Sequence, residues 1–157
     1  MVTRFFVAGR PAPQGSKSIS RTGHLYETSR HLKPWRATVA LAARAQRPTM
    51  IEGPVVLGME FIMPRPKATP KTRPTPPAVR RPDIEKLARA VSDALTGVFF
   101  GDDAQVTVMP LAKRVAEAGE LPGVKIFVAP CDPAAVAEVL AQLYAAPVCS
   151  CYTTCLE

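Results

Sequence analysis

Apolar residues recur at three- and four-residue intervals in three segments of the chain, and this spacing predicts amphipathic helices. We expect these helices over residues 34–46, 83–96 and 133–144. The second has the clearest signal, because Ile84, Leu87 and Val91 belong to one apolar stripe and the charged residues lie off it. Asp83, which follows a proline, marks the start of this helix, and Gly97 marks its end.

Short runs of β-branched and aromatic residues predict the strands of a sheet. The expected strands cover residues 4–7, 53–63, 104–115 and 124–128. Because only the loop 117–123 separates the last two strands, we expect them to pair as a β-hairpin. At 157 residues, of which 47% are hydrophobic, the chain fits one domain with a single core.

Two stretches lack the periodicity of a helix or a strand. Residues 9–33 are rich in Gly, Pro, Ser and basic residues, which predicts a loop. Residues 64–82 contain seven prolines, six Lys/Arg and no acid, so neither a helix nor a central strand is expected there. This long basic loop either lies along a sugar-phosphate backbone or is a solvated linker.

Charge is distributed unevenly along the chain. Residues 1–82 contain 15 Lys/Arg and 3 Asp/Glu, whereas residues 83–157 contain 5 and 10, and the formal net charge is +7. A cationic half attracts a polyanion by counterion release, so nucleic acid is the leading candidate partner. The alternative is that the basic surface only keeps the protein soluble.

The apolar runs and the cysteine spacing limit where the protein acts and which metal sites it could hold. The first apolar run is too short for a signal peptide and no segment approaches a membrane span, so we expect a cytoplasmic protein with no membrane partner. Cys149, Cys151 and Cys155 lie close to the end without the C-x-x-C spacing of zinc sites. We therefore divide the chain into a main domain, residues 1–130, and a C-terminal helix with a loosely held, thiol-bearing tail, residues 131–157.

Four carboxylates surround the second predicted helix: Asp83 and Glu85 at its start, and Asp102 and Asp103 beyond its end. Fourteen helical residues rise about 21 Å, and the seven residues that follow span at most about 23 Å when extended. The chain can therefore fold back and place Asp103 beside Asp83. Such a cluster suits Mg²⁺, a hard cation that takes oxygen ligands and activates water for phosphodiester hydrolysis.

A structural explanation of the same residues stays open. Asp83 is a good helix N-cap, and Glu85 complements the helix dipole. Glu85 and Arg89 would also form a favourable i,i+4 pair. Asp102 and Asp103 follow a glycine, which is typical of a turn.

The order and spacing of these pieces resemble the signature of the RusA family of Holliday junction resolvases. The similar pieces are Arg81-Pro82-Asp83 with Glu85 and Arg89, then Asp93-Ala94-Leu95-Thr96-Gly97, then Asp102-Asp103-Ala104-Gln105-Val106. The resemblance extends to the opening strand and loop, Phe5 to Lys17, and to the strand near 123–128. It covers roughly residues 4–129, which leaves the cysteine-bearing tail outside.

The resemblance implies a small α/β (α+β) fold, a mixed β-sheet packed with helices, that forms a homodimer and cuts branched DNA with Mg²⁺, or Mn²⁺ in its place. It implies that Asp83, Glu85 and Asp103 hold the metal and that Arg89 assists catalysis. We keep Asp102 as a secondary candidate ligand. Glu85 stands where the family has Asp, and Arg89 where it has Lys. Arginine is permanently protonated, so it can clamp charge but is not a proton donor of ordinary strength.

Three hypotheses about function follow. The first is a Mg²⁺-dependent endonuclease that resolves four-way junctions in recombination and repair, and whose two-fold symmetry presents one site to each of two equivalent strands. Its expected phosphate contacts are Lys17, Lys67, Lys71, Arg73, Arg80, Arg81 and Lys86. The second is a catalytically impaired accessory protein that binds branched DNA, in which Glu85 and Arg89 reflect lost chemistry. The third is an interaction protein whose charges form solvated faces.

Overall fold

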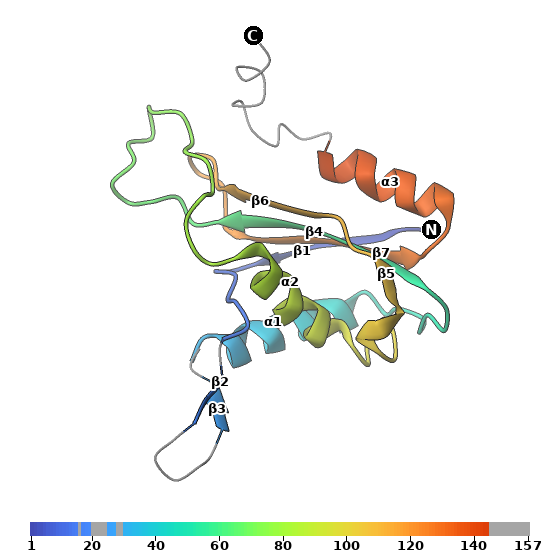
Figure 1. The fold of residues 1–157 in the computed structure, drawn as a ribbon. Coiled ribbons are helices and arrows are strands. Elements are labelled where there is room, and N and C mark those ends of the chain that lie inside the picture. The colour runs from blue at the N-terminus through green and yellow to red at the C-terminus, as the bar shows by residue number, and fades with distance from the viewer. Residues whose placement is uncertain (16, 20–24, 28–29, 145–157) are drawn as a thin grey trace.

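The computed structural model describes residues 1–15, 17–19, 25–27 and 30–144. A five-stranded mixed sheet forms its centre, with helices on both faces (Figure 1). The strands are β1 (Thr3–Ala8), β4 (Val55–Met63), β5 (Val106–Val108), β6 (Leu111–Val115) and β7 (Gly123–Pro130). The helices are α1 (Leu32–Ala45), α2 (Ile84–Leu95) and α3 (Pro133–Tyr144), with a short 3-10 turn, η1 (Asp103–Gln105). The predicted fold class, a mixed sheet packed with helices, is confirmed.

The central strand is β4, and it pairs along both of its edges. β7 runs antiparallel to it on one side and also pairs with β1, whereas β5 and β6 run parallel to it on the other side. The predicted hairpin between β6 and β7 is therefore wrong, since the two strands flank β4. Eight of the nine residues of β4 are buried, and burying a strand to this extent requires a partner on each edge. Residues 116–122 thus cross over the end of β4.

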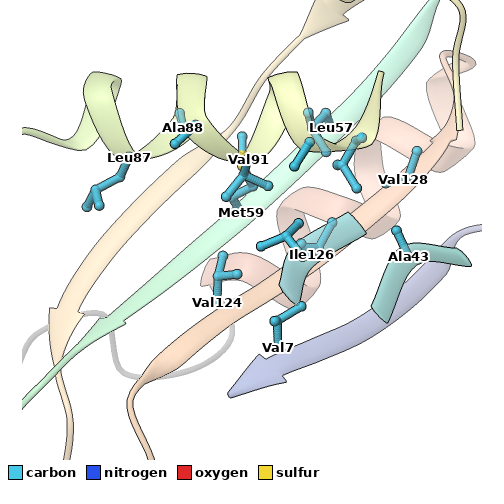
Figure 2. Packing of buried hydrophobic residues seen from close by; sticks show 14 of the residues in the cluster. Val7, Ala43, Leu57, Met59, Leu87, Ala88, Val91, Val124, Ile126 and Val128 are labelled. Carbon is cyan, nitrogen blue, oxygen red and sulfur yellow. The ribbon is translucent and has the colours of Figure 1, made fainter. Parts of the chain in front are cut away.

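Each face of the sheet packs against helices. On one face, Leu57 and Met59 of β4 meet Leu87 and Val91 of α2 in the main core (Figure 2). On the other face, a smaller cluster lies beneath α3. There Gly58 allows α3 to approach closely, because a Cβ at this position would lie 2.4 Å from Cγ1 of Val139. The alternation of side chains along β4 therefore supplies two cores, and the larger one positions α2.

Most element boundaries agree with the sequence predictions. All three helices lie within two residues of the predicted bounds, and residues 64–82 contain neither helix nor strand, as expected. The predicted loop at 9–33 differs, because it contains two short paired strands, β2 (Lys17–Ile19) and β3 (Leu25–Glu27). No described helix is both long and apolar enough to cross a membrane.

Candidate metal site and nucleic-acid interface

Two exposed carboxylates lie at the start of α2. Asp83 occupies the N-cap position, but its side chain makes no capping hydrogen bond, and the carboxylate is 61% exposed. A neighbouring cation, Lys86, places its Nζ 3.6 Å from Oδ2 of Asp83. Glu85 is exposed in the first helical turn. Because Asp83 does not use its oxygens to cap the helix, they remain available to a ligand, which argues against a purely structural role.

The two acidic residues beyond α2 differ from each other. Asp102 caps η1, since its Oδ1 accepts a hydrogen bond of 2.8 Å from the amide of Ala104. Gln105 completes a capping box and donates from Nε2 to the carbonyl oxygens of Ile51 and Gly53. Asp103 is exposed in the same turn. Asp102 therefore has a structural role, whereas Asp103 presents its carboxylate to solvent.

The predicted fold-back of Asp103 toward Asp83 is wrong. After α2 the chain turns sharply, with the amide of Gly97 donating to the carbonyl oxygen of Phe100 at 2.7 Å. Phe99 and Phe100 are buried, and their burial draws the chain into the core instead of along the helix. Asp103 consequently lies near the start of β4, where Val106 pairs with Val55.

Asp83 lies at the opposite end, because it shares a cavity lining with Met63 at the end of β4. The 12 residues of α2 alone rise about 18 Å between the two positions. Within the described part of the chain, no three His, Cys, Asp or Glu side chains are close enough to hold one metal ion. One chain therefore places Asp83 and Glu85 at the start of α2, with Arg89 exposed one turn further along the helix, and it places Asp103 at the other end.

The basic loop 64–82 is fixed at both of its ends. Near its start, the guanidinium of Arg65 donates to the carbonyl oxygens of Pro70 and Arg73, at 2.9 and 2.8 Å. Near its end, Nζ of Lys113 donates to the carbonyl oxygens of Arg80 and Pro82, at 3.2 and 2.9 Å. Five of the predicted phosphate contacts are exposed on this loop: Lys67, Lys71, Arg73, Arg80 and Arg81.

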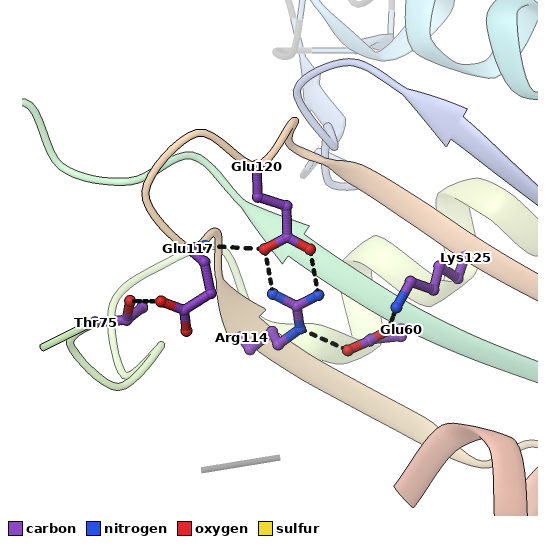
Figure 3. Close-up of polar contacts among 6 residues, drawn as sticks. All are labelled: Glu60, Thr75, Arg114, Glu117, Glu120 and Lys125. Atoms are coloured by element: carbon purple, nitrogen blue, oxygen red, sulfur yellow. Dashed lines mark hydrogen bonds and ion pairs between the residues drawn. The ribbon is translucent and has the colours of Figure 1, made fainter. Parts of the chain in front are cut away.

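A network of charged residues connects this loop to the sheet (Figure 3). Thr75 of the loop donates to the carboxylate of Glu117, whose amide donates to Oε2 of Glu120 at 2.9 Å. Glu120 accepts two hydrogen bonds of 2.6 Å from Arg114, which also donates to the buried Glu60. The hydrogen bond from Arg114 lowers the pKa of Glu120 to about 2, and the same bond raises the pKa of Arg114. Lys125 also pairs with Glu60, and its Nζ lies 2.7 Å from Oε2 of that carboxylate.

This network was not predicted from the sequence. Its single sequence signal is Glu60, an acid within the apolar run of β4, which needs a cation on a neighbouring strand. Two of the predictions lie outside what the structure describes. One concerns the side chain of Lys17, and the other concerns the cysteine-bearing tail at 145–157.

Comparison with known proteins agrees with the resemblance noted in the sequence. The model of the endodeoxyribonuclease RusA family matches residues 8–129. The chain is also 31% identical over 130 residues to the uncharacterized protein YqaN of Bacillus subtilis (strain 168), an alignment that covers 73% of this chain and 88% of YqaN. The match includes α2, the basic loop and the strands that carry them, and this chain is thus a member of the RusA family of endodeoxyribonucleases.

Proposed function

We propose that the protein is a Mg²⁺-dependent endonuclease that cuts four-way junctions and other branched DNA. The observation that carries this proposal is the position of Asp83, an N-cap residue whose carboxylate leaves its own helix uncapped and faces solvent beside Glu85. Exposed carboxylates that do not cap their own helix suit a hard divalent cation, although Asp83 also lies 3.6 Å from the ammonium of Lys86. The basic loop directly precedes this pair in the chain and supplies cations for the phosphate backbone.

The donor set of the pair fits Mg²⁺, with Mn²⁺ as a substitute, since both ions take carboxylate oxygen ligands. When bound, the ion would activate water and neutralise charge on the phosphate. Asp83 and Glu85 would hold the ion at the start of α2, and Arg89 would offer its guanidinium to the negative charge that grows on the phosphate.

We further propose that a second subunit completes the site. Asp103 is exposed, but it lies at the far end of α2 from Asp83. A two-fold axis perpendicular to α2 would pair each end of the helix with the opposite end of its copy, so a homodimer with this geometry would bring Asp103 of one subunit to Asp83 of the other. Such a dimer would hold two sites, one for each of the two strands cut at a four-way junction.

The proposed path of the DNA follows the exposed cations around this site. Phosphate contacts are assigned to Lys67, Lys71, Arg73, Arg80, Arg81 and Lys86, and to Lys17 in β2. Because Arg65 and Lys113 hold the loop in one conformation, its cations are positioned before DNA binds, which lowers the entropy cost of binding.

A comparison of Asp83→Asn, Asp103→Asn and Asp102→Asn tests this function. The first two variants should lose cleavage of a synthetic four-way junction by at least about 100-fold while still binding it. Asp102→Asn removes the same charge but keeps a good helix cap, so it should cut at nearly the wild-type rate. Unchanged cleavage by Asp83→Asn would contradict the metal-site assignment.

The second candidate function is a branched-DNA-binding accessory protein with impaired catalysis. Two departures from the family pattern favour it, Glu85 in place of Asp and Arg89 in place of Lys. It predicts salt-sensitive binding of junctions by the wild-type protein with no cleavage at any Mg²⁺ or Mn²⁺ concentration. Cleavage that depends on Asp83 excludes it.

A further inference from the structure

A cavity of about 740 Å³ opens beside the start of α2. Residues 8–15, which begin at the last residue of β1, form one wall, and Trp35 of α1 and Met63 of β4 form others. The amide of Gln14 donates a hydrogen bond of 2.8 Å to the carbonyl oxygen of Lys86, so this segment is held against α2. The cavity is therefore built from four separate stretches of the chain, and its shape depends on their packing.

The lining residues are of two chemical kinds. Ala12 and Trp35 are buried and make part of the wall apolar, whereas Arg10, Arg81 and Lys86 are exposed cations. A simple anion would make no favourable contact with the apolar wall, and an apolar ligand would make none with the three cations. The combination fits a molecule with a flat body and an anionic group, which is the chemistry of a nucleotide. Pockets of this volume hold ligands of that size.

Asp83 also lines the cavity, so the cavity and the proposed metal site share one edge. A nucleotide in the cavity would consequently be the neighbour of the phosphate that is cut. A base within an intact duplex must be unpaired and unstacked before it can enter, at a cost of a few kcal/mol. A base at a branch point is already poorly stacked, so its entry costs less.

We propose that the cavity receives one unstacked nucleotide of the cleaved strand, next to the scissile phosphate, and that this requirement selects branched over fully paired DNA. The inference rests on the proposed nuclease function, because Asp83 defines which phosphate is cut. It adds a binding site for a single nucleotide to the proposed metal site.

A fluorescent base placed at the branch tests this proposal on the full chain. The DNA is a four-way junction with 2-aminopurine either at the branch point or within a paired arm, and Ca²⁺ replaces Mg²⁺ to prevent cutting. Emission from 2-aminopurine rises when the base leaves the stack. The wild-type protein should raise it at the branch position and leave the arm position unchanged.

A phenylalanine placed inside or outside the cavity provides a matched pair of variants. Thr38 is exposed on α1 and lines the cavity, and its hydroxyl donates only to the carbonyl oxygen of Pro34 in the same helix. Thr38→Phe puts a bulky ring into the cavity without changing the charge, so it should abolish the emission rise and lower kcat/KM on the junction by about 10- to 100-fold. Leu41→Phe places the same ring at an exposed position of α1 outside the cavity and should behave as wild type.

The sole tryptophan, Trp35, gives a second readout. Titration with single-stranded hexathymidylate should change its emission in the wild type and in Leu41→Phe, but not in Thr38→Phe. The proposal is overturned if the wild type raises emission equally at the branch and arm positions, or if a well-folded Thr38→Phe variant keeps the rise and the cleavage rate. A branch-specific rise without any cleavage in Mg²⁺ would instead remove the nuclease function and leave the nucleotide site.

Discussion

Asp83 has an unusual position for a helix N-cap, because its side chain leaves the helix amides alone and lies toward solvent and Lys86. The position of its carboxylate therefore depends on the backbone that carries it and not on a capping hydrogen bond. Lys113 holds that backbone, since its ammonium group takes the carbonyl oxygens of Arg80 and Pro82. Lys113 is thus expected to act as a positioning residue for the metal site.

Lys113→Met should lower the affinity for Mn²⁺ by about tenfold, which is the usual cost of losing a group that orients a metal ligand. The measurement is calorimetric titration of Mn²⁺ without DNA, so that lost phosphate contacts do not contribute. Lys33→Met removes the same charge from an exposed position on α1 and serves as the control. Equal Mn²⁺ affinity in both variants would show that Lys113 does not position the site.

For single residues, the sequence predicts the chemistry of a side chain better than it predicts which other residues that side chain contacts. The exposure of Asp83 and Glu85 follows from their place before and off the apolar stripe of α2. The separate roles of Asp102 and Asp103 could not be predicted, because adjacent acids in a turn have the same local pattern. The bond between Arg114 and Glu60 joins residues 54 positions apart, and no local signal specifies it.

At the scale of elements, the helices and most strands follow from periodicity, whereas the errors arise where tertiary packing overrides local preference. β6 and β7 are close in sequence, which favours a hairpin, but the buried strand β4 takes both as neighbours. Likewise, the segment after α2 is long enough to return along the helix, but burial of Phe99 and Phe100 stops it. In both cases, the arrangement that forms depends on how much apolar surface the rest of the fold buries.

The charged network contacts the basic loop, and its contribution to stability depends on pH. The pKa of Glu120 is about 2, below its ordinary value of 4.5, because Arg114 stabilises the carboxylate. The stabilisation from Glu120 is therefore complete above pH 4.5 and is lost as the pH falls from 4.5 toward 2. Through Glu117 and Thr75, this loss also loosens the loop.

Glu120→Gln should be less stable than the wild type at pH 7, and the difference should shrink as the pH falls from 4.5 to 2. Urea denaturation at a series of pH values measures both unfolding free energies. Glu138→Gln removes an exposed acid from α3 and should follow the wild-type curve. A difference between Glu120→Gln and wild type that stays constant through this window would refute the assignment.

At the scale of the whole molecule, exposed cations line the proposed DNA path, whereas exposed carboxylates mark the proposed metal site. Lys67→Ala combined with Lys71→Ala should reduce the slope of log K against log salt concentration by about 2, one for each lost phosphate contact. Fluorescence anisotropy of a labelled junction measures this slope. The pair Lys33→Ala and Arg44→Ala removes the same charge from exposed positions of α1, and an equal change in slope there would mean that the loop has no special role.

We propose that the two ends of α2 act together across a dimer. Asp83→Asn and Asp103→Asn should each be inactive as homodimers. In a mixed dimer of the two, one site loses both carboxylates, whereas the other has Asp83 from one subunit and Asp103 from its partner, so it is intact.

Co-refolding the two inactive variants in equal amounts and assaying a four-way junction is therefore the most direct measurement. About half of the dimers should be mixed, each with one working site, so single-strand nicking should return to about a quarter of the wild-type site activity. If the mixture stays as inactive as its components while mixed dimers are shown to form, the carboxylates do not meet across the subunits and the account is contradicted.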